Sequence, residues 1–433
     1  MIMVAMFLAV IALLFIGVTT AGSMALVSIS TYYLLGEASM GNMISLPQGM
    51  FYQVSGVTLM SIPFFLLMGN FMNEGGISKD LFGFARACLG HRWGGLASAA
   101  ILSCMVMAAM SGSAAAVAAG IGMVAIGEML DTGYQRPLVC ATIGAAGALG
   151  PIIPPSIVMI MYASMISDPK IAVSVNDIFL GGVIPGVMTG LFFIAYTSYI
   201  CKKRNIGRVP AVPMKERWIY FGRAIFALLT PVIILGGIFG GLFTATEAAA
   251  IAALYAGILG LFKYRKITVQ DFPRIFWNTA KSTAQIMFVI STASFFQYVL
   301  LKTRIPQMVV KSVVGVLNSF APILVVIILL LLIMGCFMEG ASILMITAPI
   351  FVPLAQAYNY SVISLGVLMA ITLAAGAITP PVGLNLYVMS SITGEKVMNI
   401  AKEAFPYLIC MFLVSLLTAF VPPLTTFLPA LFK

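Results

Sequence analysis

Long apolar runs, each about the length of a membrane-crossing helix, alternate with short polar stretches along most of the chain. A helix needs about 20 mostly apolar residues to cross a bilayer, whereas membrane strands alternate in polarity at every second residue. The pattern therefore predicts an all-α membrane protein. Spans are expected at residues 1–33, with a kink at Gly17 or Gly22, at residues 54–72, with a kink at Pro63, and at residues 178–200, 223–241, 244–262, 282–301 and 405–421. Residues 37–53 should be a loop, and residues 271–280 should lie at the membrane interface.

Two further apolar segments are each interrupted by a Pro-Pro pair. Residues 137–166 contain Pro154 and Pro155, and residues 361–391 contain Pro380 and Pro381. Proline lacks a main-chain N–H and clashes with the preceding turn, so each segment should be a helix broken in its middle. Carbonyl groups freed at such a break cost several kcal/mol in apolar surroundings unless something coordinates them.

Each broken helix is preceded by an apolar segment with a polar interruption. Ser111, Gly112 and Ser113 interrupt residues 96–129, and Glu339 and Gly340 interrupt residues 322–356. We expect both segments to be re-entrant helical hairpins, each preceded by an amphipathic stretch, at residues 79–92 and 302–311. The order of span, amphipathic piece, hairpin and broken helix therefore occurs twice in the chain.

The distribution of Lys and Arg predicts the orientation of this repeat, because cytoplasmic loops are enriched in both. With the most basic loop, residues 202–217, placed inside, the first hairpin enters from inside and the second from outside. The halves are then inverted repeats, as in many secondary transporters, with about nine full crossings. Of the 23 Lys and Arg, those left outside are Lys170, Lys302, Arg304, Lys311 and Lys433.

The composition agrees with a membrane protein and excludes several other classes. Of the 433 residues, 61% are hydrophobic and 8% are charged, and the mean hydropathy is +1.09. The apolar N-terminus, uncharged up to Glu37, favours a retained span over a cleaved signal peptide. The net charge of +10 is spread over short loops and does not indicate nucleic-acid binding. Six scattered cysteines without a CxxC motif and a single histidine, His91, argue against a disulfide framework or a zinc site.

The sequence contains no phosphate-binding GxxxxGK[ST] loop, HExxH motif or GxSxG nucleophile motif. An intramembrane hydrolase would need a buried nucleophile and base, which one interfacial histidine does not supply. A transporter driven by an ion gradient or by a partner fits better, and a channel is a weaker alternative.

The hairpin tips and the helix breaks together form a candidate cation site. Ser111–Ser113 and Gly340–Ser342 offer hydroxyl groups and the free main-chain groups of helix ends. If each tip faces its break, at residues 150–155 and 376–381, oxygen atoms alone could surround a small hard cation. Positive helix ends would then face an anion between the two cages. The alternative interpretation of each tip is a packing seam of small residues.

Two acidic residues lie in apolar runs. Glu339 is either functional, as intramembrane acids usually are, or a partnered structural carboxylate at a hairpin tip. Glu247 follows Thr244 by three residues before an Ala-rich run, which predicts a helix-capping box.

Several motifs together resemble the large membrane subunit of TRAP (tripartite ATP-independent periplasmic) transporters, over essentially the whole chain. These motifs are MSGSAAAVAAGIG, GALGPIIPPSIVMIMYA, GGLFTATEAAAIAALYAGI, MEGASILMITAPIFVPLA and GAITPPVGLNLYV. The resemblance implies a bacterial inner-membrane symporter for carboxylates such as C4-dicarboxylates or sialic acid, coupled to Na⁺. It also implies two partners, a small four-helix membrane subunit and a periplasmic substrate-binding protein, besides the surrounding lipid. A stand-alone Na⁺/dicarboxylate symporter of the same plan is the main rival.

The resemblance also implies an elevator mechanism and assigns residues to it. The sliding transport domain would comprise residues 94–175 and 322–395, against a scaffold of residues 1–93, 176–321 and 396–433. One Na⁺ site would be formed by Ser111, Ser113, Gly150, Ile153 and Pro155, and the other by Gly340, Ser342, Gly376, Thr379 and Pro381. The substrate-side residues would be Ser156, Asn385 and Glu339. Pro151 departs from the family, which usually has an apolar residue other than proline there.

Overall fold

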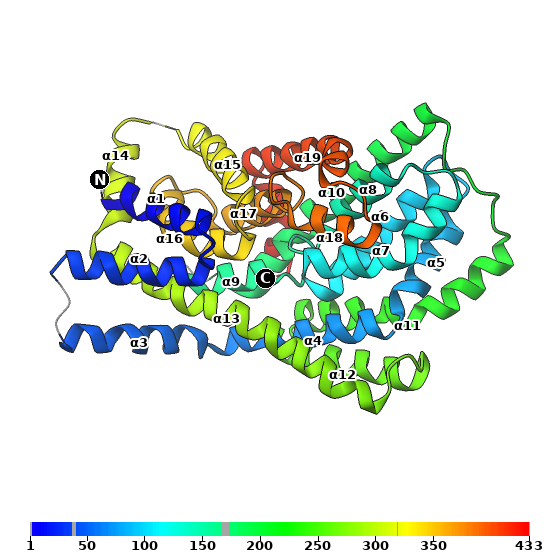
Figure 1. Cartoon of the computed structure of the whole chain (residues 1–433), viewed down its shortest axis with the longest axis horizontal. Coiled ribbons are helices and arrows are strands. Elements are labelled where there is room, and N and C mark those ends of the chain that lie inside the picture. The colour runs from blue at the N-terminus through cyan, green and yellow to red at the C-terminus, as the bar shows by residue number, and fades with distance from the viewer. Residues whose placement is uncertain (1, 37–39, 167–172, 318, 433) are drawn as a thin grey trace.

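A computed structural model describes residues 2–36, 40–166, 173–317 and 319–432 (Figure 1). These ranges contain helices and no β-strand, which confirms the all-α prediction. Short 3-10 helices at Val57–Met60 and Val269–Asp271 and a π-helical turn at Leu259–Lys263 join some of the α-helices. The α-helices are α1 (Ile2–Phe15), α2 (Thr20–Leu34), α3 (Met40–Val54), α4 (Ser61–Glu74), α5 (Ile77–Leu89), α6 (Gly95–Ser111), α7 (Ala114–Asp131), α8 (Arg136–Gly147), α9 (Ile157–Met165), α10 (Val175–Arg204), α11 (Met214–Phe239), α12 (Ala245–Ile258), α13 (Phe272–Lys302), α14 (Ile305–Val314), α15 (Ala321–Gly335), α16 (Gly340–Ala357), α17 (Val362–Gly376), α18 (Leu384–Thr393), α19 (Val397–Phe420) and α20 (Pro423–Leu431).

The N-terminal region differs from the prediction in two places. Residues 1–33 do not form one kinked span: α1 and α2 are separate helices that pack against each other, joined by a turn in which Gly17 has φ +93°. Glycine reaches positive φ without steric cost, so the turn needs no polar signal. The predicted loop at residues 37–53 is also wrong from residue 40 onward, where α3 forms in spite of Pro47. Packing of α3 along α13 outweighs its weak helix propensity.

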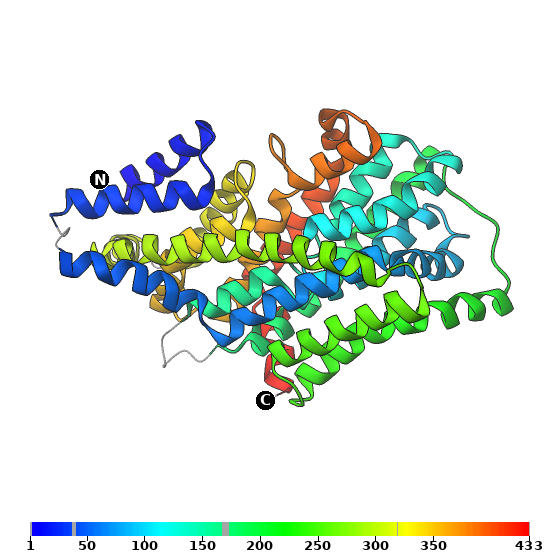
Figure 2. The same cartoon turned by 60° about the horizontal axis from the view of Figure 1, so that its bottom comes forward.

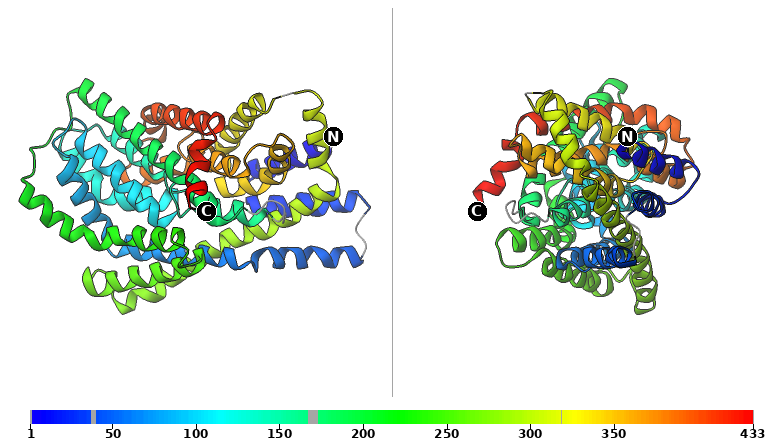
Figure 3. Two further views of the ribbon diagram at one scale, coloured as in Figure 1. Left: turned by 180° about the vertical axis from the view of Figure 1, so that it is seen from behind. Right: turned by 90° about the vertical axis from the view of Figure 1, so that its left-hand side faces the viewer.

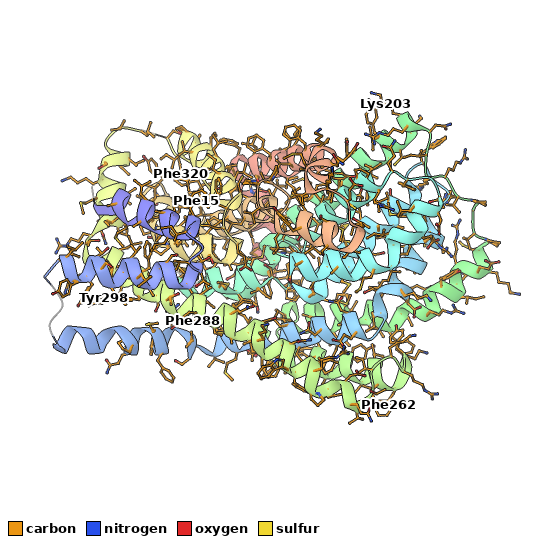
Figure 4. The ribbon with its side chains drawn as sticks, viewed as in Figure 1. Phe15, Lys203, Phe262, Phe288, Tyr298 and Phe320 are labelled. Carbon is orange, nitrogen blue, oxygen red and sulfur yellow. The ribbon has the colours of Figure 1, made fainter. Side chains whose placement is uncertain are left out.

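The predicted interfacial segment at residues 271–280 and the predicted basic loop at residues 202–217 are also partly helical in the structure. Residues 271–280 are not a separate interfacial piece, because they begin the continuous helix α13. The basic residues 202–217 lie partly on helix ends, since α10 extends to Arg204 and α11 begins at Met214. Lys203 projects from the edge of the molecule, whereas Phe262 and Phe288 project from apolar helices elsewhere on the surface (Figure 4).

Both predicted hairpins and both predicted broken helices are present. The hairpins are α6–α7 and α15–α16, and the broken helices are α8–α9 and α17–α18. The Pro154–Pro155 and Pro380–Pro381 bonds are both cis. The predicted capping box is confirmed: the Thr244 hydroxyl accepts from Glu247 N, and the Glu247 carboxylate accepts from Thr244 N.

The helices form two groups: Figure 1 shows α3, α4 and α12 along the lower side of the molecule and α15, α17 and α19 along the upper side, and Figure 2 shows the molecule from a second direction. We call α2–α4 and α11–α13 the peripheral group, in which α4 packs on α12 and α13 packs on α2 and α3. The central group is α6–α10 and α15–α19, around α8 and α17, whose residues are almost all buried. The last helix, α20, packs on α10 and projects to one side (Figure 3).

Contacts within the central group come in matching pairs. α6 packs on α8 as α15 packs on α17, and α7 packs on α18 as α16 packs on α9. α10, which follows the first broken helix, packs on α17, and α19, which follows the second, packs on α8. Elements in corresponding positions of the two halves therefore have corresponding neighbours.

Seven helices in the described ranges are long and apolar enough to cross a membrane, or eight if the bent pair α3–α4 counts as one span. Two of the seven, α7 and α16, are hairpin arms. The broken helices fall below this length in each half. Helix length thus confirms a multi-pass membrane protein but does not test the prediction of nine crossings, which counts each broken helix as one.

Candidate functional site

The first break begins where α8 ends, and the end of α8 is fully hydrogen-bonded. The last four carbonyl groups of a helix have no donor within the helix. In α8, three of them accept bonds of 3.0–3.2 Å from the main chain of residues 148–150, in a tightened last turn. The fourth, Gly144 O, accepts a 2.8 Å bond from Asn385 Nδ2 of α18. A residue of the second broken helix therefore caps the first.

Beyond that turn, the first break leaves carbonyl oxygens without donors. Within the described part of the chain, no hydrogen bond reaches the main-chain oxygen of Gly150, Ile153 or Pro155. All three residues are buried. Because nearly all buried carbonyl groups are paired with a donor or with another ligand, three such oxygens in one short loop call for a binding partner.

The first hairpin tip lies directly against this loop. A Cβ built on Gly112 would lie 2.7 Å from Pro155 O, and one built on Gly150 would lie 2.8 Å from Ser113 O. Gly112 also has φ +62°, which disfavours any other residue. The glycines thus allow the tip and the break to approach each other to main-chain contact, as the sequence predicts.

In the second unit, the contacts join the broken helix to the end of α15, just before the tip. Val382 N donates a 3.1 Å bond to Cys336 O, just before the tip. A Cβ on Gly376 would lie 2.7 Å from the Cα of Gly335, so two helices cross there at main-chain distance. In the described ranges, the carbonyl groups of Thr379 and Pro381 accept no hydrogen bond.

The hydroxyl groups predicted as ligands differ in whether they already form hydrogen bonds. Ser111 Oγ is buried and bonds only weakly within the tip, at 3.3–3.4 Å from Ser113 N and O. Neither Ser113 Oγ nor Ser342 Oγ has a hydrogen-bond partner among the described residues, and Ser342 is buried beside the second tip. Thr379 Oγ1 already donates to Ala375 O at 2.8 Å, so it can offer only a lone pair.

The three residues predicted on the substrate side lie in different environments. Ser156 is buried and caps α9: its hydroxyl donates to Pro151 O at 2.5 Å and accepts from Met159 N. Asn385 is buried, and its Oδ1 has no partner in the part of the chain that the structure describes. Glu339 is exposed at the second tip and makes no capping bond to α16.

The donor set fits a small hard cation better than a transition metal. The free donor atoms at the tips and breaks are carbonyl and hydroxyl oxygens, and cations such as Na⁺ prefer oxygen ligands. Within the described ranges, no three or more His, Cys, Asp or Glu side chains lie together so that they could hold a metal ion. In the first half, residues of the tip and of the break approach each other to main-chain contact.

One feature near the site was not predicted from the sequence. Tyr407 of α19 is fully buried, and its hydroxyl lies 2.7 Å from both Thr142 of α8 and Thr197 of α10. The rings of Phe193 and Tyr196 pack edge-on against it. Three helices are joined by one hydroxyl cluster, but its members are 55 to 265 residues apart in sequence, where no local pattern could reveal them.

Comparison with known proteins adds an independent line of evidence. Residues 7–424 match the family described as the DctM component of the tripartite ATP-independent periplasmic transporters. The chain is 40% identical over 373 residues to the C4-dicarboxylate TRAP transporter large permease protein DctM of Pseudomonas aeruginosa, covering 86% of each chain. It is 34% identical over 385 residues to the sialic acid TRAP transporter large permease protein SiaM of Vibrio cholerae, covering 89% of each.

Among solved structures, the fold is similar to that of the YdaH transporter of Alcanivorax borkumensis. The TM-score is 0.64, with 90% of this chain and 91% of that chain covered. Because the sequence identity is only 16%, this similarity concerns the fold alone.

Proposed function

The chain belongs to the DctM-component family of TRAP transporters, and we propose that it is the permease subunit that imports an organic anion together with Na⁺. Its relatives are named as transporter permeases, so it is not an enzyme. The resemblance to the TRAP large subunit inferred from the sequence motifs is confirmed by the family match.

The observation that carries the Na⁺ proposal is the set of buried carbonyl oxygens without donors at Gly150, Ile153 and Pro155. With Ser111 and Ser113 from the tip, they would hold one Na⁺. Gly340, Ser342, Gly376, Thr379 and Pro381 would hold the second. When bound, Na⁺ supplies positive charge beside the region where an anion is carried.

An anionic substrate fits the arrangement of helix ends. Four helices, α7, α9, α16 and α18, begin at the two tips and the two breaks. Their N-terminal N–H groups give partial positive charge, which attracts carboxylates. Relatives named for C4-dicarboxylate and for sialic acid both carry carboxylates, so we propose a carboxylate of one of these types. Ser156 and Asn385 would shape its pocket, and Glu339 would lie at the rim.

Matching contacts in the two halves support inverted repeats and an elevator mechanism. In this mechanism the hairpins and broken helices slide as one body against the peripheral group. The sequence placed α10 and α19 with the scaffold, but both pack on α8 and α17. We therefore propose that α10 and α19 move with the transport domain.

Family membership also supports the proposed partners and location. We propose a bacterial inner-membrane complex with a small four-helix membrane subunit, and delivery of substrate by a periplasmic binding protein. The rival, a stand-alone symporter, shares the hairpins and breaks but needs neither partner.

Reconstitution of the complex in liposomes separates these possibilities. We expect uptake of a C4-dicarboxylate or sialic acid to require both an inward Na⁺ gradient and the binding protein. Equal uptake without the binding protein would favour the stand-alone symporter, and non-saturating uptake that ignores Na⁺ would favour a channel.

Substitutions at the tips test the ligand assignment within the same assay. Because hydrogen bonds and ligands to charged groups contribute about 1.5–3 kcal/mol, S113A or S342A should raise the half-saturating Na⁺ concentration about tenfold or more. The control is S103A, since Ser103 lies in the same hairpin and bonds only to Ala99 O. Unchanged Na⁺ titrations in both tip variants would refute the assignment. E339Q should slow transport, and a wild-type rate would return Glu339 to a structural role.

A further inference from the structure

The amphipathic helix α5 lies between the two groups of helices. It packs on the first hairpin, α6 and α7, and on α11 of the peripheral group. Leu81 and Phe82 are buried, and Phe84 makes a ring contact with Phe221 of α11 at 5.5 Å. Any relative motion of the two groups has to be accommodated at one of the two faces of α5.

Arg86, in the last turn of α5, bonds to both sides at once. Its Nη1 forms an ion pair with Glu128 of α7, and its Nη2 donates a 3.2 Å hydrogen bond to the hydroxyl of Tyr220 on α11. The guanidinium also lies 5.9 Å from the centre of the Tyr220 ring. The planar fork of arginine allows two such bonds in fixed directions, which a lysine cannot provide.

We infer that Arg86 is a conformational latch, which stabilises the arrangement seen here by binding the first hairpin and the peripheral group together. This inference rests on the proposed function, because the latch matters only if the central group moves. If α5 stays with α11, the bond to Glu128 must break; if α5 follows the hairpin, the bond to Tyr220 must break.

Within the described ranges, the other ion pairs between helices lie inside one group of helices. The Arg204–Glu403 ion pair, at 2.9 Å, joins α10 to α19 within the central group, and Arg274–Glu74 joins α13 to α4 within the peripheral group. At the second amphipathic helix, α14, the neighbouring link is uncharged: Tyr358 donates to Leu317 O at 2.7 Å. Among the described residues, the latch is therefore seen at the first hairpin.

The latch should favour the observed arrangement of the two helix groups without preventing other arrangements. The side chains of Arg86 and Glu128 are each 33% exposed, so water and salt screen their attraction. From the contribution of exposed ion pairs, we expect R86Q or E128Q to lower the population of this arrangement about two- to fivefold. R86E should have a larger effect, because it places two carboxylates together.

The populations can be measured by electron–electron distance spectroscopy on the reconstituted complex. Spin labels at positions 214 and 398, which are 68% and 62% exposed, report on α11 and α19. The six native cysteines are replaced first. R86Q and E128Q should shift the distance distribution, R86E/E128R should restore most of it, and the matched control R204Q should leave it unchanged. High salt should reduce the difference between wild type and variant.

A second experiment tests the latch by disulfide crosslinking in protein that carries the Cys88→Ser substitution. Cysteine pairs at positions 86 and 128, and at 86 and 220, are crosslinked and assayed for uptake. At least one crosslink should arrest uptake, and reduction should restore it. Unchanged distance distributions in R86Q and E128Q, an equal shift in R204Q, or full uptake with both crosslinks would overturn the latch. Wild-type protein without Na⁺-dependent uptake would instead contradict the proposed function.

Discussion

The two hairpin–break units share one plan but differ in exposure. In the first unit, the break from Ile152 through the start of α9 is buried, together with Ser111 and Gly112 at the tip. In the second unit, Pro380 to Val382 and Glu339 are exposed, although Ser342 is buried. The first unit is closed, and the second opens to the surface of the chain.

The same motif therefore places its carbonyl oxygens in two environments, one accessible from the surface and one buried. Carbonyl oxygens at the second break can be reached from the surface of the chain. Those at Gly150, Ile153 and Pro155 cannot, so they depend more strongly on a bound cation. The tips differ too, since Gly112 has a left-handed conformation and touches Pro155 O, whereas Gly340 is the first residue of a helix.

The largest expected effect comes from adding one methyl group to each tip. G112A combines a Cβ at 2.7 Å from Pro155 O with φ +62°, so it should destabilise the protein by about 3 kcal/mol. A Cβ in G340A would contact only Leu373, with Leu373 Cβ nearest at 3.3 Å, and should cost less than about 1 kcal/mol. Unfolding of the purified protein in detergent measures both.

The matched control for these variants is G127A, in the first hairpin, where nothing lies within 4 Å of the new Cβ. It should be neutral or stabilising, because alanine favours helices. Equal loss of stability in G112A and G340A would contradict the closed-versus-open comparison.

A smaller effect is expected where the second unit caps the first. N385L removes the bond from Asn385 Nδ2 to Gly144 O and leaves that buried carbonyl unpaired, which should cost about 1–3 kcal/mol. The control N399A removes only an exposed bond to Glu395 and should change stability by less than about 0.5 kcal/mol. The same unfolding assay applies, and identical midpoints for the two variants would show that the cap contributes nothing.

The smallest effect is expected at the hydroxyl cluster beside the first unit. Y407F removes the partner of Thr142 and Thr197, but both threonines can turn toward their own helix carbonyl groups, so the cost should be about 1 kcal/mol. Y199F, at an exposed tyrosine of the same helix as Thr197, is the control and should be neutral. A loss above that of N385L would reverse the order proposed here.

The sequence predicts those features of the fold that depend on residues close together along the chain. Pro-Pro pairs and the Thr244–Glu247 box act locally, so the breaks and the capping box were predicted correctly. The helix α3 was missed because its packing on α13 outweighs Pro47, and packing leaves no local signal. The approach of the first tip to the first break follows from their order along the chain and is seen in the structure.

Contacts between distant residues could not be predicted in the same way. The bond from Asn385 to Gly144 spans 241 residues, and that from Arg86 to Glu128 spans 42. Each depends on the final arrangement of whole helices, not on residue spacing along one of them. The sequence shows that Asn385 and Ser156 lie next to the breaks, but only the structure reveals their capping roles.

Thermal unfolding of the purified complex in Na⁺ and in K⁺ at equal ionic strength tests the paired cation sites most directly. Ligand binding to the folded state alone stabilises it by about 2.7 kcal/mol at 100 times the dissociation constant, so Na⁺ should raise the unfolding midpoint over K⁺. S111A, in the closed unit, should lose more of this increase than S342A. Equal midpoints in Na⁺ and K⁺ for the wild-type protein would contradict the claim that these two units bind Na⁺.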